Sequence, residues 1–282
     1  MTTPAVRIGD VTNLGNGAYA FIGGDPANAG FVVGRDGVLV IDSQLTPAHG
    51  RAMVEQIAQH ASVPMRVLFL THYHGDHVYG SQAFSDRGAV VISHRGTRAL
   101  LEERGPDMIE RSAQQRPELA PLFAELRLVL PTVTFEDRIT FHLGGVDVNA
   151  HFAGWGHTPY DCVAHVPSAR VLYAGDLLFN KGIPVVRDAN ISQWINLVRY
   201  LETIDVDHVI GGHGPAGTRA DLGELRVFLE RLLERVQAEA ARGRSLDEVK
   251  AAVPMEEYRR WGRYEALLPP AIEKVYQNLT GR

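Results

Sequence analysis

The stretch THYHGDHVYG, residues 71–80, places three histidines and one aspartate within six positions. It directly follows RVLFL, residues 66–70, an apolar run that is typical of a fully buried strand in a parallel sheet. Imidazoles and carboxylates without partners are costly in a core, and a solvated loop has no need of four of them. The chain must therefore fold so that a buried strand ends at a site that uses these groups.

Three other segments of the chain resemble this one. An imidazole or a carboxylate follows each of three further apolar runs, beside a glycine, at His157, Asp176 and His213. In layered α/β folds, functional groups converge at the ends of buried strands, and glycine lets the backbone turn sharply or approach a ligand. The four segments supply nitrogen and oxygen ligands but no thiol, a set that suits zinc, iron or manganese.

The spacing within the first segment predicts how its ligands are divided. In an extended chain His72, His74 and Asp76 point to one side, and His77 points to another. We therefore expect two neighbouring metal ions, with the two oxygens of Asp176 available to bridge them. Taken singly, a histidine here would more often be a hydrogen-bonded core residue and an aspartate a turn cap. Four coincidences at strand ends favour the metal interpretation.

The remaining pattern is that of an α/β protein. Strand-like runs over residues 18–42 and 89–94 alternate with a helical pattern over 46–62, and this alternation indicates layers of helices and sheet. Strands return from residue 132, and helical periodicity dominates after residue 217. We predict an α/β domain over residues 1–217 and a C-terminal helical extension, residues 218–282, packed on it.

Two helical segments leave alternatives open. Residues 95–130 are charged, contain prolines and interrupt the strand rhythm, so we predict a helical insertion. It is either a surface elaboration or a lid or pocket wall. The apolar residues of LLPPAIEKVYQNL, residues 267–279, suit either a pocket wall or the contact of a homodimer.

Composition excludes several classes of protein. The net charge of −5 disfavours nucleic acid as a partner, since nucleic-acid binders usually present a basic face. The single cysteine, Cys162, permits neither an intrachain disulfide nor a cysteine-based zinc site. No apolar run approaches the roughly 20 residues of a membrane span, and the first residues lack the features of a signal peptide. We expect a cytoplasmic protein that acts on a small molecule and binds neither nucleic acid nor membrane.

The motifs resemble those of a known family. THYHGDH is similar to the H-x-H-x-D-H signature of the metallo-β-lactamase superfamily, and His157, Asp176 and His213 follow in the order of its remaining ligands. The segment NAGFVVGRDGVLVID, residues 28–42, resembles its first strand pair, in which Asp42 would support the site. The resemblance spans residues 15–215. It implies a four-layer αβ/βα sandwich, the metallo-β-lactamase fold, here with a helical insertion and C-terminal helices.

The resemblance also implies a role for each ligand. His72, His74 and His157 would bind a first metal ion, and Asp76, His77 and His213 a second, with Asp176 as the bridge. Two Zn²⁺ ions per chain are expected, and iron or manganese would fit the same ligands. Two ions can hold a shared hydroxide at neutral pH. Asp76 would then be the catalytic residue that orients this hydroxide or carries a proton to the leaving group.

The resemblance constrains the identity of the substrate less than it constrains the metal ligands. The ligand set resembles that of the glyoxalase II type, whereas true β-lactamases of the superfamily generally carry Cys or Ser where this chain has Asp176. Acyl-homoserine lactonases usually carry Tyr at the position of Phe179. The hypothesis is a dinuclear zinc hydrolase of a small ester, thioester or lactone. Its alternatives are β-lactam hydrolysis, a mononuclear iron dioxygenase of the persulfide type, and a scaffold that has lost its chemistry. Four aromatic residues either line an acyl pocket or pack around the site: Tyr73, Tyr79, Trp155 and Tyr160.

Overall fold

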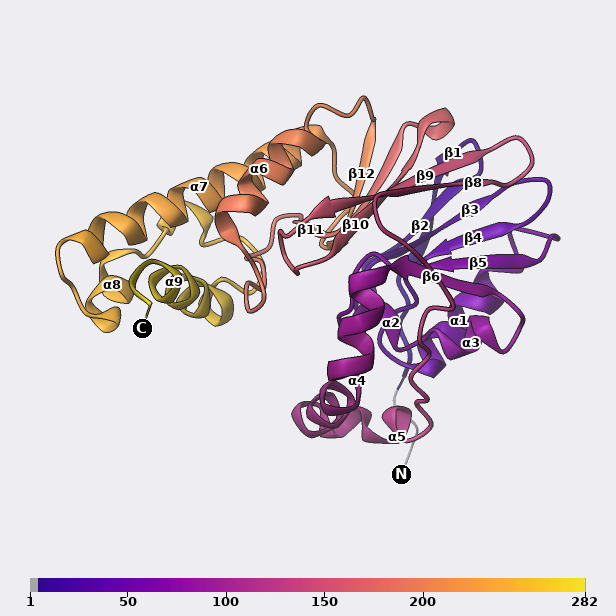
Figure 1. Cartoon of the computed structure of the whole chain (residues 1–282), viewed down its shortest axis with the longest axis horizontal. Coiled ribbons are helices and arrows are strands. Elements are labelled where there is room, and N and C mark those ends of the chain that lie inside the picture. Colours follow the sequence, from indigo (N-terminus) through magenta and orange to yellow (C-terminus); the bar gives the residue numbers. More distant parts are fainter. Residues whose placement is uncertain (1–4, 282) are drawn as a thin grey trace.

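Two β-sheets lie face to face at the centre of the computed structural model, which describes residues 5–281 (Figure 1). The first sheet has seven strands, which lie side by side in sequence order. They are β1 (Asp10–Gly15), β2 (Ala18–Ile22), β3 (Ala29–Val33), β4 (Val38–Ile41), β5 (Met65–Phe69), β6 (Val90–His94) and β7 (Val133–Phe135).

The first sheet changes from antiparallel to parallel at β4. Strands β1 to β4 form hairpins, and Gly34 donates to the carbonyl of Gly37 across the β3–β4 turn, whose Asp-Gly pair is typical of such turns. From β4 to β7 the strands are parallel, so each connection crosses over. The crossovers contain α1 (Pro47–Ile57), α2 (Gly75–Val78), α3 (Gln82–Ser85), α4 (Arg95–Gln115) and α5 (Ala120–Phe123), with a 3₁₀ turn, η1 (Pro117–Leu119).

The second sheet has five strands in the order β12-β11-β10-β9-β8. Only β11 and β12 are parallel, because α6 connects them, and the other pairs are antiparallel. Its elements are β8 (Arg138–His142), β9 (Asp147–Gly154), β10 (Asp161–Val166), η2 (Pro167–Ala169), β11 (Val171–Phe179), α6 (Ile191–Leu201) and β12 (His208–His213).

Three apolar clusters show the four layers of the sandwich. The middle cluster joins the inner faces of both sheets, where Val32 and Phe69 of the first sheet share a core with Val148 and Ile210 of the second. The second cluster packs the first sheet against α1, α3, α4 and α5. The third packs the second sheet against α6 and the C-terminal helices. The αβ/βα sandwich that the motifs implied is therefore the fold of the chain.

The C-terminal helices extend the third layer. α7 (Arg219–Ala241) lies beside α6, and α8 (Leu246–Ala252), the 3₁₀ turn η3 (Glu256–Tyr258) and α9 (Tyr264–Thr280) complete a helical bundle that projects from the sheets (Figure 1). Ser245 caps α8, since its hydroxyl accepts from the N–H of Glu248, whose carboxylate accepts from the N–H of Ser245. Within residues 5–281, no helix has the length and apolarity needed to cross a membrane.

Candidate metal centre

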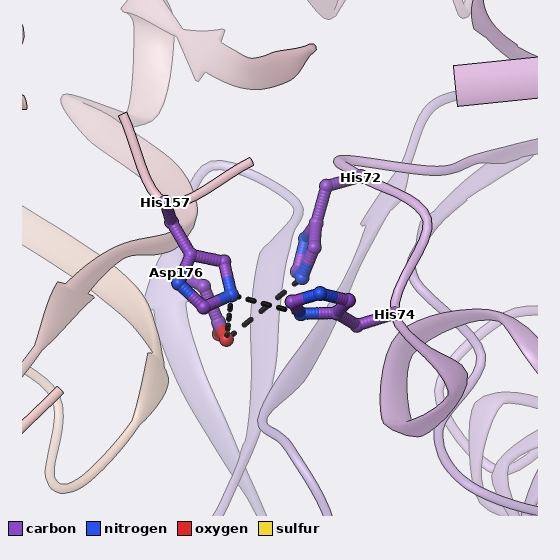
Figure 2. Close-up of side chains that lie close together, drawn as sticks. All are labelled: His72, His74, His157 and Asp176. Carbon is purple, nitrogen blue, oxygen red and sulfur yellow. Dashed lines mark hydrogen bonds and ion pairs between the residues drawn. The ribbon is translucent and has the colours of Figure 1, made fainter. Parts of the chain in front are cut away.

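Four buried side chains from three separate segments meet at one edge of the two sheets. His72 and His74 follow β5, His157 lies in the loop between β9 and β10, and Asp176 lies within β11. Their side chains point toward one another (Figure 2), and one ligand atom from each lies within 4.8 Å of all the others. His157 Nε2 is 2.9 Å from His74 Nδ1 and 3.1 Å from Asp176 Oδ2. This arrangement is a candidate for one metal ion.

A second cluster adjoins the first. Asp76 and His77 lie on the short helix α2, and His213 is the last residue of β12. Their ligand atoms also lie within 4.8 Å of one another, and His213 Nε2 is 3.3 Å from Asp76 Oδ2. All seven residues that the sequence singled out as ligands are thus brought into two adjacent groups.

Asp176 faces both clusters, one with each carboxylate oxygen. Its Oδ2 is 3.1 Å from His157 Nε2 and 3.8 Å from His72 Nε2. Its Oδ1 is 3.1 Å from His77 Nε2 and 3.5 Å from His213 Nε2. A carboxylate placed in this way is suited to bridge two ions.

Unpaired polar atoms test whether a metal fits here. His72 Nε2, His77 Nε2 and Asp176 Oδ1 are buried and have no hydrogen-bond partner among the described residues. Buried polar groups are nearly always paired, so unpaired atoms of this kind in both clusters indicate positions for positive partners. The donors are imidazole nitrogens and carboxylate oxygens, which zinc, iron and manganese all accept. The residues present therefore fit a divalent metal.

One extended-chain prediction is wrong. Period-two alternation placed Asp76 with His72 and His74, but Asp76 groups with His77 and His213 instead. The reason is that the chain is not extended there: α2 begins at Gly75, and His77 donates its backbone N–H to the carbonyl of His74. A helical turn places consecutive residues about 100° apart rather than 180°, so Asp76 and His77 reach the same cluster.

Asp42 orients His77. Asp42 Oδ2 is 2.7 Å from His77 Nδ1, which leaves Nε2 free to face the metal position. The same carboxylate accepts from the backbone N–H and the hydroxyl of Thr71, each at 2.8 Å. Asp42 has a φ of 59°, an unusual conformation for a residue other than glycine. Three hydrogen bonds to the carboxylate thus hold the backbone of Asp42 in this strained conformation.

Asp188 orients His74 and was not anticipated from the sequence. Its Oδ2 is 3.0 Å from His74 Nε2, and the Tyr73 hydroxyl donates to the same oxygen at 2.8 Å. His74 therefore presents Nδ1 to the cluster, whereas the other clustered histidines present Nε2. Asp188 lies in an irregular loop after β11, with neither a motif nor a strand end beside it, so the sequence carried no signal for it.

Two backbone contacts hold the loops of the site together. The carbonyl of Val185 lies 2.9 Å from His157 Nδ1, which fixes that ring. The side-chain amide of Asn28 donates to the carbonyls of Gly211 and Gly214, each at 2.9 Å, and so ties the β2–β3 loop of the first sheet to the end of β12. His213 is positioned by this connection between the sheets.

The charges of the site are strongly coupled. Burial would raise the pKa of Asp176, but His213 and His77 outweigh this effect and hold it well below its usual value. Burial would lower the pKa of His213, but the carboxylates of Asp176 and Asp76 raise it to about 9. The carboxylates are therefore ionised and ready to bind a cation, and a metal that binds must displace protons from imidazoles of the second cluster.

A cavity of about 920 Å³ opens over the two clusters. His74, Asp76, Asp176 and His213 line it, so ligand side chains from both clusters face its interior. The predicted insertion contributes Arg104, Met108, Arg111, Ser112 and Gln115 from α4. The insertion is therefore a wall of this cavity and not a surface elaboration remote from it.

The four aromatic residues near the motifs have different roles. Tyr73 lines the cavity, whereas Tyr79 packs in the core beneath the first sheet. Tyr160 stacks on His94, and Trp155 is 43% exposed and donates its indole N–H to the carbonyl of Asp188. Among these four, only Tyr73 lines the cavity over the clusters, within the part of the chain that the structure describes.

Comparisons with known proteins agree with this geometry. The model of the metallo-beta-lactamase superfamily matches residues 22–213. A curated relative, the metallo-beta-lactamase type 2 of Bacteroides fragilis, is 21% identical over 77% of this chain and 85% of its own length. Another, from Elizabethkingia meningoseptica, is 23% identical over 66% of this chain and 68% of its own length.

Two solved structures are similar in fold. A metallo-beta-lactamase from Pontibacter korlensis has a TM-score of 0.67 and 22% identity, and the match covers 78% of this chain and 98% of that one. A double mutant of the sec-alkyl sulfatase PisA1 has a TM-score of 0.79 and 20% identity. The second match covers 97% of this chain and 50% of the sulfatase, so it takes in the C-terminal helices as well as the sheets.

Proposed function

Because this chain belongs to the metallo-β-lactamase superfamily, whose members are metal-dependent hydrolases, we propose that it uses two metal ions to cleave a small ester, thioester or lactone. The observation that carries this proposal is the placement of Asp176, whose two oxygens each face a different cluster of ligands. We assign His72, His74 and His157 to one ion and Asp76, His77 and His213 to the other, with zinc as the expected metal.

The metals and the side chains contribute separately to this reaction. When bound, two divalent cations would lower the pKa of water toward about 7 and stabilise negative charge on the oxygen of the group under attack. Asp42 and Asp188 keep His77 and His74 in the tautomers that point a bare nitrogen inward. These hydrogen bonds set the geometry of the site before substrate arrives.

We assign to Asp76 the role of orienting the water that attacks the substrate. It lines the cavity and its side chain is 32% exposed, so it can reach both water and substrate. Burial would raise its pKa, but His213 and His77 lower it, so the carboxylate is ionised at neutral pH. Asp76 therefore accepts a hydrogen bond from the attacking water and orients it.

Elemental analysis of the purified protein, combined with a hydrolysis screen, tests the proposal. We expect two zinc ions per chain and turnover of at least one thioester, lactone or simple ester. Asp176→Ala is expected to lose metal and activity together, because it removes the contact shared by both clusters. Asp86→Ala serves as the control, since Asp86 is an exposed carboxylate that pairs with Arg127. Full turnover by metal-depleted Asp176→Ala would refute the assignment, and one iron per chain with oxygen consumption would support a dioxygenase instead.

Sulfate-ester hydrolysis is a second candidate. The match to the sec-alkyl sulfatase takes in nearly the whole chain, whereas the match to the Pontibacter korlensis enzyme covers 78% of it. The screen should therefore contain secondary alkyl sulfates. β-Lactams belong in the screen too, because the curated relatives are named metallo-beta-lactamases.

A further inference from the structure

Several positively charged side chains line the cavity over the metal position. Within residues 5–281, five arginines contribute to its wall, namely Arg104, Arg111, Arg116, Arg187 and Arg263. They come from three distant parts of the chain: α4 and its C-cap, the loop after β11, and the residue that precedes α9. The whole chain carries a net charge of −5, so this concentration of positive charge is local.

The carboxylates in and beside the cavity neutralise this charge only in part. Asp188 lies 3.4 Å from Arg187, and Glu103, the neighbour of Arg104 in the chain, lies 3.6 Å from that guanidinium. Four aspartates line it, but Asp76 and Asp176 belong to the ligand clusters. Asp188 already accepts from His74 and Tyr73 through the same oxygen, Oδ2. Asp25 is then the remaining carboxylate of the lining, and it lies 3.6 Å from Arg7. Bound divalent ions would increase the positive charge of the cavity further.

Two of the arginines converge beside the ligand His74. The guanidinium carbon of Arg104 is 5.9 Å from the centre of the Tyr73 ring, and its Nη1 is 3.4 Å from the Tyr73 hydroxyl. Arg187 Nε is 3.4 Å from Asp188 Oδ2. The side chains of Arg104 and Arg187 are 41% and 64% exposed, so N–H groups of both remain available to a ligand in the cavity.

The same cavity has an apolar lining. Ile22, Leu45, Met108 and Val185 contribute to it. Guanidinium groups present parallel N–H donors that match the oxygens of carboxylate, sulfate and phosphate. A cavity that combines such donors with apolar walls suits a molecule that has both an oxyanion and a hydrocarbon part.

We propose that the substrate of this hydrolase is an amphiphilic anion, whose carboxylate, sulfate or phosphate group is bound by Arg104 and Arg187. The hydrocarbon part lies against Met108 and Val185, which line the same cavity. This inference rests on the proposed hydrolase function and specifies its substrate class. Arg111, Arg116 and Arg263 contribute long-range attraction for the anion.

Equilibrium binding of unreactive probes tests the proposal apart from turnover. Titration calorimetry on the metal-loaded enzyme would compare hexane-1-sulfonate, hexanoate and hexylphosphonate with neutral hexanamide. We expect at least one anion to bind more tightly than the amide, and to lose about tenfold or more in affinity in Arg104→Gln/Arg187→Gln, because charge-assisted hydrogen bonds are removed. The anion that binds most tightly identifies the group.

A matched control lies on the same helix. Arg95 begins α4 but lines a different cavity, beside Glu136, so Arg95→Gln should leave anion binding unchanged. Added salt should weaken binding of the anion more than that of the amide. Equal binding of anion and amide, or full anion affinity in the double variant, would overturn the proposal. Each single variant provides the same comparison if the double variant does not fold.

The substrate class and the hydrolase function can fail separately. Suppose that anions bind through these arginines but the protein hydrolyses nothing in the screen. The anion site is then supported, and the proposed hydrolase function is wrong. Ester hydrolysis by the wild type, together with full anion affinity in the double variant, would support the hydrolase function and remove the anion site.

Discussion

At the scale of single residues, the site depends on carboxylates that form hydrogen bonds to the ligand histidines. His77 and His74 each present one nitrogen to a cluster because a carboxylate holds the other, Asp42 in the first case and Asp188 in the second. Such outer partners fix the tautomer and the orientation of a metal-binding imidazole. Substitution of these partners should therefore weaken metal binding without removing a ligand.

Asp188→Asn is expected to lower metal affinity by about 10–100-fold. The amide keeps the shape of the side chain but removes the charge that supports His74, and Asp188 is partly exposed, so the fold should persist. Competition with a chromophoric chelator measures the affinity. Tyr73→Phe is the control, since it removes a different hydrogen bond to Asp188 and leaves His74 in place. An unchanged affinity in Asp188→Asn would show that His74 does not depend on it.

Gly212→Ala is expected to impair metal binding through sterics alone. A Cβ at this position would overlap Asp176 Oδ1 and lie 3.0 Å from His77 Cε1, so the residue before His213 must lack a side chain. The variant should contain fewer than two metal ions per chain by elemental analysis. Gly182→Ala is the control, because the nearest atom that a Cβ would meet there is 3.8 Å away. Two ions per chain in Gly212→Ala would contradict the steric argument.

At the scale of elements, short segments decide where functional groups point. β11 is buried along all nine residues, yet it carries the charged Asp176 because imidazoles surround that carboxylate. α2 is only four residues long, and it directs Asp76 and His77 to the second cluster. Thr46 caps the N-terminus of α1, and its hydroxyl oxygen is 2.6 Å from His49 Nδ1. Each of these elements places a titratable side chain in a buried or partly buried position.

The start of α1 should make stability depend on pH. Burial lowers the pKa of His49 to about 4, so the folded state binds a proton less readily than the unfolded state, where the pKa is near 6.5. Stability attributable to His49 is therefore present above pH 6.5 and is lost as pH falls toward 4. The loss should be roughly 2 kcal/mol between pH 6.5 and 4.5.

Urea unfolding at these two pH values measures this loss. The difference in unfolding free energy between pH 6.5 and pH 4.5 should be smaller in His49→Gln than in the wild type, since glutamine does not titrate. His142→Gln is the control, because His142 is an exposed side chain. The same pH dependence in His49→Gln and in the wild type would assign the effect to other groups.

At the scale of the whole molecule, the C-terminal helices complete the core. Leu222, Leu225, Phe228 and Leu229 of α7 are buried in the same apolar cluster as Leu178 of β11. Full burial of each such side chain contributes about 1.5–3 kcal/mol. The helices also contribute to the cavity, since Arg263 at the start of α9 lines it. The bundle that projects from the sheets therefore supports both the fold and the site.

Truncation after residue 217 is expected to give a chain that aggregates or unfolds. The cut would expose the outer face of the second sheet and of α6, where Trp194 and Val198 are buried in that cluster. Solubility on expression and thermal unfolding provide the measurement, with the full chain as reference. A soluble, cooperatively folded truncated chain that retains two metal ions would show that the sandwich is independent of the helices.

The ligands can be identified from the sequence because the pattern that marks them lies in neighbouring positions. Each follows an apolar run beside a glycine, and the strand ends could be expected to converge without knowledge of the register. Asp188 and Asn28 carried no such signal, because a loop residue acquires its role only from what packs against it. The helical turn at α2 was missed too, since four residues are too few to show a period.

The layered α/β class, the seven metal-type side chains and the inserted helical segment follow from the sequence, because hydrophobic periodicity and residue chemistry are properties of neighbouring positions. The family resemblance also implied how the ligands divide, whereas spacing alone placed Asp76 in the wrong group. The tertiary structure was needed to show which oxygen of Asp176 faces each cluster, and that five arginines of the described residues line the cavity. These features join residues up to 159 positions apart, from Arg104 to Arg263. Their proximity follows from sheet packing and loop paths, to which local sequence patterns contribute no direct signal.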